Sequence, residues 1–330
     1  VELYKSTEGA SSWVDSTNWL SSTVSICEWT GISCNEAGDV VTGLNLNDNG
    51  LRGTLPDELI MMTGLEVIDL GYNELTGNIP SDLSKLKSLT TLNVRNNDFS
   101  GSIPGELMNL SSLVNLDLSS NSLSGEIPSE MGQLFSLQSL ALKDNSISGR
   151  IPTELGQLIN LAVLNLTSNS LTGRIPSQLG QLYTLEYLYL NWNDLTFSMP
   201  SELGRLYNLV YLSASWNSLN GLIPTELGQL SSATSLQLSF NSFSGAIPSQ
   251  LGQLISLQYL YLNNNSLTSS IPAELGRLSS LVDLYVHLND LTGVMPAETC
   301  NLRETNGGLL SDLWADCQEE LICTCCTYCY

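Results

Sequence analysis

Positive charge is scarce in this chain. Of its 330 residues only 11 are Lys or Arg, against 33 Asp or Glu, which gives a formal net charge of −22. We expect neither nucleic acid nor an anionic membrane surface as a partner, because both repel an acidic protein. The sequence also has no apolar run near the roughly 20 residues of a membrane span, so we predict no membrane insertion here. Its 42% hydrophobic content nevertheless excludes a disordered chain.

Groups that carry enzyme chemistry are equally few. The sequence has one histidine, His287, and no glycine-rich phosphate loop, metal-ligand spacing or Ser/His/Asp arrangement. Asp69, Asp117 and Asp283 are expected on outward strand positions. The first two come near the separation of roughly 5 to 9.5 Å that glycosidase carboxylates have, but without a substrate cleft around them. We therefore predict a non-enzymatic protein with no cofactor and no metal, and a solvated His287 whose alternative role is a partner contact.

Cysteine is absent from the middle of the chain. Cys27 and Cys34 precede residue 41, and the other six follow near the end: Cys300, Cys317, Cys323, Cys325, Cys326 and Cys329. This placement predicts disulfide cross-links at both ends and an oxidising compartment, hence a secreted or cell-surface protein. The start at Val1 suits a processed secretory protein or a trimmed fragment. A zinc site in the C-x-C-C-x-x-C cluster is the alternative, disfavoured because no histidine accompanies it.

Proline is absent from all but one column of an internal repeat. The 11 prolines stand at steps of 24 residues from Pro56 to Pro296, and an asparagine precedes each of them by seven positions, from Asn49 to Asn289. Such a period indicates a solenoid, in which each repeat packs only on its neighbours. A stacked array grows by adding repeats, so we predict one elongated domain despite the length.

The two halves of a repeat have different periods, as residues 137–160 show. Leu140 and Leu142 alternate with polar or small residues, which predicts a short strand with both leucines inward. Leu155 and Leu158 share one face of a predicted short helix. Consecutive strands are expected to stack in parallel, about 4.8 Å apart, as a concave sheet with the helices on the convex side.

Three further columns have structural explanations. Asn145 is expected to point inward and bond open backbone groups, and Gly149 to permit a tight turn. Phe197 and Ser269 replace that glycine in two repeats. The carboxylate of Glu154, two residues after proline, is expected to meet the unpaired N–H groups at the start of the short helix, an acidic binding stripe being the alternative.

The residues ahead of the repeats, together with the repeats themselves, resemble those of a known protein family. They read NWLSSTVSICEWTGISCNEAGDVVTGLNL from Asn18, and the repeats carry L-x-G-x-I-P. Together these features resemble plant-type extracellular leucine-rich-repeat proteins, which include receptor-kinase ectodomains and polygalacturonase inhibitors, over about residues 17 to 300. The resemblance implies that Cys27 pairs with Cys34, that Trp29 closes the core of the first turn, and that a second short strand lies at one edge.

The last 30 residues depart from that family. Their A-D-C followed by C-x-C-C-x-x-C resembles the cysteine-rich ends of secreted algal repeat proteins, and the sequence does not choose among the disulfide pairings. We predict an α/β solenoid: a right-handed leucine-rich-repeat superhelix of eleven 24-residue repeats over residues 41–299. A Cys/Trp-containing cap over residues 1–40 and a Cys-rich cap over residues 300–330 are expected to close its ends.

Aromatic residues gather on outward positions of the last five repeats. The candidates for ligand or partner binding are Tyr187, Tyr189, Trp192, Tyr211, Trp216, Phe240, Tyr259, Tyr261 and Tyr285. The same columns are mainly polar in the first six repeats, and Tyr and Trp are residues that interfaces favour. Irregular residues such as Phe197, Met199, Ala214 and Ala233 fall in the same region. The alternative is that aromatic ladders only stabilise the sheet.

The resemblance suggests a protein, a peptide or a cell-wall glycan as ligand, and the sequence does not choose between them. A matrix or adhesion protein that self-associates through the same surface is the structural alternative. Ice binding is disfavoured, because no outward column is a regular threonine array. Asn109, Asn165 and Asn264 begin N-glycosylation sequons, and the last two are expected on or beside the sheet, next to the aromatic region.

Overall fold

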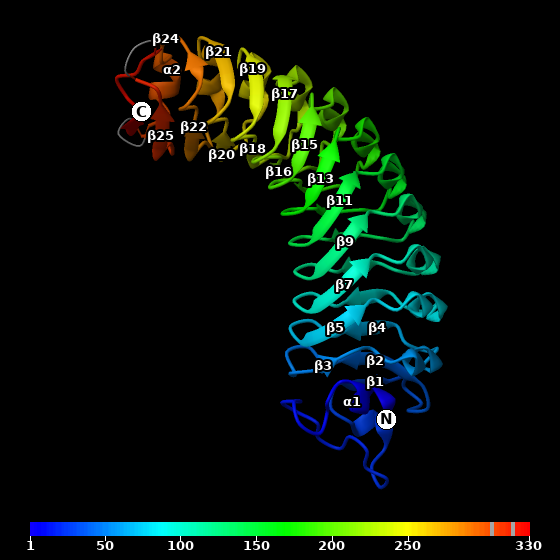
Figure 1. Cartoon of the computed structure of the whole chain (residues 1–330). Coiled ribbons are helices and arrows are strands. Elements are labelled where there is room, and N and C mark those ends of the chain that lie inside the picture. The colour runs from blue at the N-terminus through cyan, green and yellow to red at the C-terminus, as the bar shows by residue number, and fades with distance from the viewer. Residues whose placement is uncertain (304–306, 318–320) are drawn as a thin grey trace. The chain divides into compact units, whose positions relative to one another are not determined.

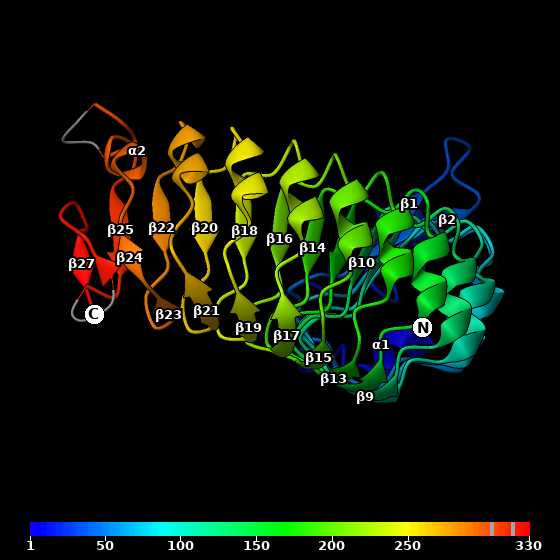
Figure 2. The same ribbon diagram turned by 90° about the horizontal axis from the view of Figure 1, so that it is seen from above.

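The computed structural model describes residues 1–303, 307–317 and 321–330. These residues form two compact units, Val1–Leu161 and Ala162–Tyr330. Both units are built from the same coil, in which a short strand, a turn, a second short strand and a 3-10 helix follow each other. Within each unit the first strands lie on one side of the coils and the helices on the opposite side (Figures 1 and 2). The predicted leucine-rich-repeat solenoid is confirmed.

The first unit begins with α1 (Glu2–Ser6), η1 (Ile26–Glu28) and β1 (Ile32–Cys34). Its main sheet continues with β2 (Val41–Asn45), β4 (Val67–Asp69), β6 (Thr91–Asn93), β8 (Asn115–Asp117) and β10 (Ser139–Ala141). The second ribbon contains β3 (Arg52–Gly53), β5 (Glu74–Asn78), β7 (Asp98–Ser102), β9 (Ser122–Glu126) and β11 (Ser146–Arg150). The 3-10 helices are η2 (Asp57–Met61), η3 (Ser81–Lys85), η4 (Gly105–Asn109), η5 (Ser129–Gln133) and η6 (Thr153–Gln157).

The second unit repeats this order. Its main sheet contains β12 (Val163–Asn165), β14 (Tyr187–Tyr189), β16 (Tyr211–Ser213), β18 (Ser235–Gln237), β20 (Tyr259–Tyr261), β22 (Asp283–Tyr285), β25 (Asp312–Ala315) and β27 (Tyr328–Cys329). The second ribbon contains β13 (Ser170–Gly173), β15 (Asp194–Phe197), β17 (Ser218–Leu222), β19 (Ser242–Gly245), β21 (Ser266–Ser269) and β23 (Asp290–Leu291), and β24 (Gly293–Val294) pairs with β26 (Leu321–Ile322). The helices are η7 (Ser177–Gln181), η8 (Ser201–Arg205), η9 (Thr225–Gln229), η10 (Ser249–Gln253), η11 (Ala273–Arg277) and α2 (Ala297–Cys300).

The register keeps every column in line. β1 pairs antiparallel with β2, and the repeat strands pair in parallel, with Leu92 opposite Leu116 and Leu188 opposite Leu212. Because the step is constant, inward leucines stack on inward leucines and outward residues on outward residues. The inward residues form the core, and Leu140 is fully buried. The second strand expected at the L-x-G-x-I-P edge is present in both units.

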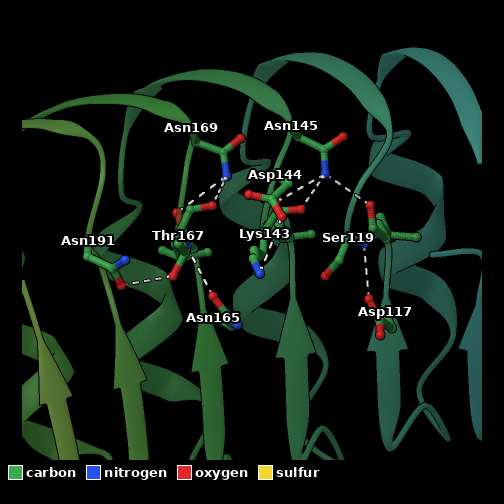
Figure 3. A network of polar contacts seen from close by, with 12 residues as sticks. Asp117, Ser119, Lys143, Asp144, Asn145, Asn165, Thr167, Asn169 and Asn191 are labelled. Atoms are coloured by element: carbon green, nitrogen blue, oxygen red, sulfur yellow. Dashed lines mark hydrogen bonds and ion pairs between the residues drawn. The ribbon is translucent and has the colours of Figure 1, made fainter. Parts of the chain in front are cut away.

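The asparagine column bonds the backbone, as predicted. Asn145 donates from Nδ2 to the carbonyls of Leu118 at 3.0 Å and Leu142 at 3.1 Å (Figure 3), and its Oδ1 accepts the N–H of Leu123 at 3.0 Å. Asn169 in the second unit likewise donates to the carbonyl of Leu166. One amide therefore bonds backbone groups of its own repeat and of the preceding one.

The glycine column also behaves as expected. Gly149 has a φ of +76°, and the two replacements hold the same left-handed conformation, Phe197 at +67° and Ser269 at +69°. This conformation costs a non-glycine residue roughly 1–2 kcal/mol. At Phe197 the guanidinium of Arg174 lies over the ring, 4.6 Å from its centroid, which offsets part of that cost.

The predicted helix cap is wrong in detail. The repeat helices η2 to η11 are short 3-10 helices, and η6 follows Pro152 without a side-chain hydrogen bond at its N-terminus. The carboxylate of Glu154 instead accepts the hydroxyl of Thr153 at 3.1 Å. The turn is satisfied by the backbone, because the N–H of Leu155 donates to the carbonyl of Pro152.

The two ends of the chain are cross-linked. Cys27 forms a disulfide with Cys34. In the aromatic cluster of the same cap, the ring centroid of Trp19 lies 4.7 Å from that of Trp13 and 5.1 Å from that of Trp29. Trp13 is the buried ring of this cluster, whereas the resemblance gave the core position to the half-buried Trp29. The remaining disulfides are Cys300–Cys325, Cys317–Cys329 and Cys323–Cys326. No helix among the described residues is long and apolar enough to cross a membrane.

Candidate functional site

The sheet face of the second unit carries the predicted aromatic residues. Parallel pairing aligns Tyr187 with Tyr211 in one outward column, and Tyr189, Ser213, Gln237, Tyr261, Tyr285 and Trp314 in the next. The second column is therefore aromatic at both ends and polar where β16 and β18 cross it. The face is therefore uneven where Ser213 and Gln237 interrupt the aromatic column.

Three rings stack at the carboxyl end of the strands, and we call them the aromatic ladder: Trp192, Trp216 and Phe240. The ring of Trp216 lies 4.2 Å from that of Trp192 and 3.7 Å from that of Phe240, with interplanar angles of 8° and 10°. Trp192 is 50% exposed and Trp216 40%. Both flat faces of Trp216 are therefore covered by its neighbours, whereas Trp192 and Phe240 are each stacked on one face only.

The backbone of the ladder is strained. Its residues have φ values of +58°, +57° and +54°, in a column that Asp144 and Ser168 also occupy at +53°. Asn, Asp and Ser tolerate this left-handed conformation, whereas bulky residues there are outliers. Each aromatic residue costs roughly 1–2 kcal/mol in backbone strain, and each stacked pair returns about 0.5–1.5 kcal/mol. The ladder is therefore a weak device for stabilising the sheet.

A second set of rings, which we call the aromatic wall, consists of Tyr261, Tyr285 and Trp314. The rings of Tyr261 and Tyr285 stack with their centroids 4.6 Å apart and an interplanar angle of 16°. The ring centroids of Tyr285 and Trp314 are 5.2 Å apart. The phenol of Tyr261 donates to Oδ2 of Asp283 at 2.9 Å. Burial and this carboxylate raise the pKa of Tyr261 far above its usual value, and burial raises the pKa of Tyr285 as well.

A hollow of about 400 Å³ lies where the aromatic column is interrupted. It is lined by Asn191, Trp192, Ser213, Ser215, Trp216, Gln237, Ser239, Phe240, Tyr261, Asn263, Tyr285, His287 and Trp314. Ser213 and Gln237 stand where the neighbouring strands carry tyrosines. The lining contains no Lys, Arg, Asp or Glu. The hollow thus combines aromatic borders with an uncharged polar floor.

His287 corrects a sequence expectation. We expected a solvated residue, but His287 is buried, with 5% of its surface exposed. The ring of Tyr330 stacks on it at 4.5 Å and 9°, and Trp314 lies 5.4 Å away. Burial lowers the pKa of His287, and the nearby Asp316 opposes this shift. Its Nδ1 is buried without a hydrogen-bond partner among the described residues.

The hollow includes only part of the predicted site. Five predicted residues line it: Trp192, Trp216, Phe240, Tyr261 and Tyr285. The others are half-buried on the same sheet face: Tyr187, Tyr189, Tyr211 and Tyr259. Tyr189 lies 4.8 Å from Tyr211, and burial raises the pKa of both phenols. Trp314 and the serines of the floor were missed. The break in the tyrosine column at Ser213 was the signal that would have shown the floor.

The sequons differ in exposure. Asn109 ends η4 and is exposed. Asn165 is half-buried at the end of β12, where its Oδ1 accepts the N–H of Thr167 at 3.1 Å. Asn264 is half-buried in the same column as Phe240, with a φ of +54°.

The carboxylates and cysteines considered for chemistry are engaged elsewhere. Asp69 accepts Nδ2 of Asn93 at 2.9 Å, and Asp117 accepts the N–H of Ser119 at 3.0 Å. The sulfurs of Cys317, Cys323 and Cys326 lie within 4.8 Å of one another. All three are in disulfides, which leaves no thiolate to bind zinc in this state.

The sequence matches known repeat families over most of its length. Residues 122–250 match a leucine-rich repeat region, and residues 40–99 and 231–291 match the leucine rich repeat. The chain belongs to the leucine-rich-repeat family. A putative leucine-rich repeat receptor-like serine/threonine-protein kinase of Arabidopsis thaliana is 42% identical over 71 residues, which are 21% of this chain and 7% of that protein.

Solved structures place this leucine-rich-repeat protein beside plant receptor ectodomains. The plant peptide hormone receptor RGFR1 in complex with RGF2 has a TM-score of 0.83 and 34% identity, over 90% of this chain and 49% of that one. The Arabidopsis receptor kinase HAESA, in complex with the peptide hormone IDA and the co-receptor SERK1, has a TM-score of 0.81 and 34% identity. The match covers 93% of this chain and 50% of that one. The chain thus spans about half the length of these receptors.

A plant ice-binding protein also shares the fold, with a TM-score of 0.65 and 25% identity over 89% of this chain and 86% of that one. The plant-type extracellular character that the sequence indicated is confirmed by these similarities. They are consistent with an extracellular or cell-surface leucine-rich-repeat protein, and the fold is typical of binding proteins rather than enzymes.

Proposed function

We propose that this leucine-rich-repeat protein is a secreted, non-enzymatic binding protein whose ligand contacts the sheet face of the second unit. The contact residues would be Tyr187, Tyr189, Trp192, Tyr211, Trp216, Phe240, Tyr259, Tyr261 and Tyr285. In the two receptor structures the partner is a peptide hormone. This supports ligand binding by the present chain. Residues 1–40 and 300–330 act as disulfide-linked caps of the repeats.

The aromatic ladder carries this proposal. Trp192 and Trp216 hold unfavourable left-handed backbone conformations and remain half exposed to solvent. Residues that keep strain without burying their rings are better explained by a contact outside the chain than by internal stability.

The experiment is a comparison of two double variants. Trp192→Ala with Trp216→Ala removes two rings of the ladder. Tyr183→Ala with Tyr207→Ala is the matched control, because these rings are 55% and 52% exposed, belong to the same two repeats, and lie before the strands instead of after them. The wild type and both double variants are tested for binding to a peptide display library, to a glycan array and to purified wild-type protein.

We expect the first double variant to lose the ligand that the wild type selects, by at least about tenfold in affinity, and the control to keep it. Equal binding by both variants would contradict the proposal. Sedimentation of the same proteins separates the alternative function: an adhesion protein would self-associate, and the Trp variant would sediment as a monomer.

A further inference from the structure

Tyr261 offers one flat ring face to the hollow. Tyr285 stacks on its β22 side at 4.6 Å. The opposite face points toward β18, where Gln237 is its register partner. The hydrogen bond from the phenol to Asp283 fixes the ring in this position. Unlike Trp216, which has a ring stacked on both faces, Tyr261 has among the described residues a ring stacked only on its β22 side, and it lines the hollow.

The floor beside that ring is polar and shallow. Ser213, Ser215 and Ser239 line it together with Gln237. Gln237 donates to Ser235, and Ser239 donates to Asn263, so the floor presents hydroxyl and amide groups that belong to separate hydrogen-bonded pairs. A ligand that covers these groups without bonding them pays for their desolvation. The ligand must therefore bring hydrogen-bonding groups of its own.

Charge narrows the ligand class further. The lining of the hollow contains no Lys or Arg to pair with an anion, and the carboxylate of Asp283 accepts the phenol of Tyr261. The net charge of −22 repels acidic ligands in general. A strongly cationic ligand would find no carboxylate in the lining. A neutral ligand meets neither obstacle.

We propose that the hollow between the aromatic ladder and Tyr261 binds a neutral carbohydrate, with the apolar face of one sugar ring against Tyr261 and its hydroxyls on the Ser213–Gln237 floor. The inference deepens the proposed function and depends on it. A sugar ring carries an apolar C–H face and a rim of hydroxyls, which is the combination that ring and floor require. A phenylalanine or proline side chain of a peptide would fill the space but has no hydrogen-bonding group, so only the peptide backbone could pair with the floor. The volume of about 400 Å³ is that of a small-ligand site.

The test begins with the whole chain on an array of gluco-, manno-, xylo- and galacto-oligosaccharides, with oligogalacturonates as acidic and chitosan oligomers as cationic members. The Asn264→Gln variant is run beside the wild type, because a glycan on Asn264 would lie next to Phe240. We expect neutral members to bind, and acidic and cationic members to bind more weakly. A charged member that binds best, or an array without any neutral binder, overturns the carbohydrate assignment.

Calorimetry with the best neutral oligosaccharide then tests the residues. We expect Tyr261→Ala to weaken binding about tenfold or more, and Tyr261→Phe, which keeps the ring, only about threefold or less. Gln237→Leu is expected to weaken a sugar about tenfold through the lost hydrogen bonds. It would leave an aromatic peptide unaffected. Tyr183→Ala is the control. If Tyr261→Ala fails to fold, the sugar affinity of Gln237→Leu still tests the carbohydrate proposal.

Failure of this inference is distinguishable from failure of the proposed function. If no sugar binds but a selected peptide loses affinity in the Trp192→Ala, Trp216→Ala variant, the carbohydrate is wrong and the binding surface stands. If no ligand and no self-association depends on any of these rings, both are wrong.

Discussion

The ring of Trp216 lies 4.2 Å from that of Trp192 and within 8° of parallel, while both residues hold a left-handed backbone. Stacking and strain therefore act against each other in the same two residues. Because strain offsets stacking, a substitution that relieves the strain can separate stability from binding.

Trp216→Asn is that variant. Asparagine tolerates the left-handed conformation, so relief of roughly 1–2 kcal/mol of strain should offset most of the lost stacking. We expect the free energy of unfolding in denaturant to change by less than about 1 kcal/mol, while ligand affinity falls. A loss above about 3 kcal/mol would mean that the ladder serves the sheet, as the alternative reading of the sequence holds. Trp216→Ala, which keeps the strain, should be less stable than Trp216→Asn.

His287 makes stability depend on pH in the acid range. Its pKa is lowered below 6.5 in the folded protein, so the unfolded chain binds more protons between the two pKa values. The contribution of neutral His287 is therefore fully present above about pH 6.5 and decreases as the pH falls. Asp316 limits the effect. We expect the melting temperature to fall from pH 7.5 to pH 5, with a smaller fall in His287→Gln. Identical slopes would contradict this role.

Tyr261 acts in the alkaline range. Its folded pKa lies above the usual 10.0, so the folded state holds the proton more tightly than the unfolded state. Stability from Tyr261 is present below about pH 10 and is lost as the pH rises further. Ultraviolet titration should show fewer phenolates than free tyrosines would give, and Tyr261→Phe should remove part of that difference. A normal titration in both proteins would disprove the Tyr261–Asp283 hydrogen bond.

Asn145 tests the backbone ladder. Its amide serves the carbonyls of Leu118 and Leu142 and the N–H of Leu123. Asn145→Ala removes these hydrogen bonds, although the carbonyl of Leu118 keeps a bond from Asn121 at 3.2 Å, and each buried group left unpaired costs roughly 1–3 kcal/mol. We expect a loss of several kcal/mol in the free energy of unfolding, measured in urea. Ser139→Ala is the control in the same repeat, because its side chain lies on the outward face of β10, and it should change stability little.

The predictability of this fold followed from its constant period. Leu140, Asn145 and Gly149 could each be explained from the sequence, because one step of 24 residues fixes which side chains stack. The helix cap at Glu154 was not predictable, since a short 3-10 helix satisfies itself through Pro152. The repeat period predicts which side chains stack in a column, but it does not predict the hydrogen bonds within a short 3-10 helix.

The site was predictable only where the repeat continues. The aromatic columns were visible in the sequence, and five of their residues line the hollow. The burial of His287 was not, because it depends on Trp314 and Tyr330, which come from a tail without the period. The pairing of β25 with β22 and of β27 with β25 brings them there, and no pattern in the tail indicates that register.

The central claim is that ligand contacts the sheet face of the second unit at the aromatic ladder and the hollow. Amide hydrogen exchange, with and without a ligand that the wild type selects, tests it most directly. We predict slower exchange on ligand binding in segments 187–193, 211–217, 235–241 and 259–263, and no change in η7 to η10. Protection confined to the first unit, or to those helices, would contradict the claim.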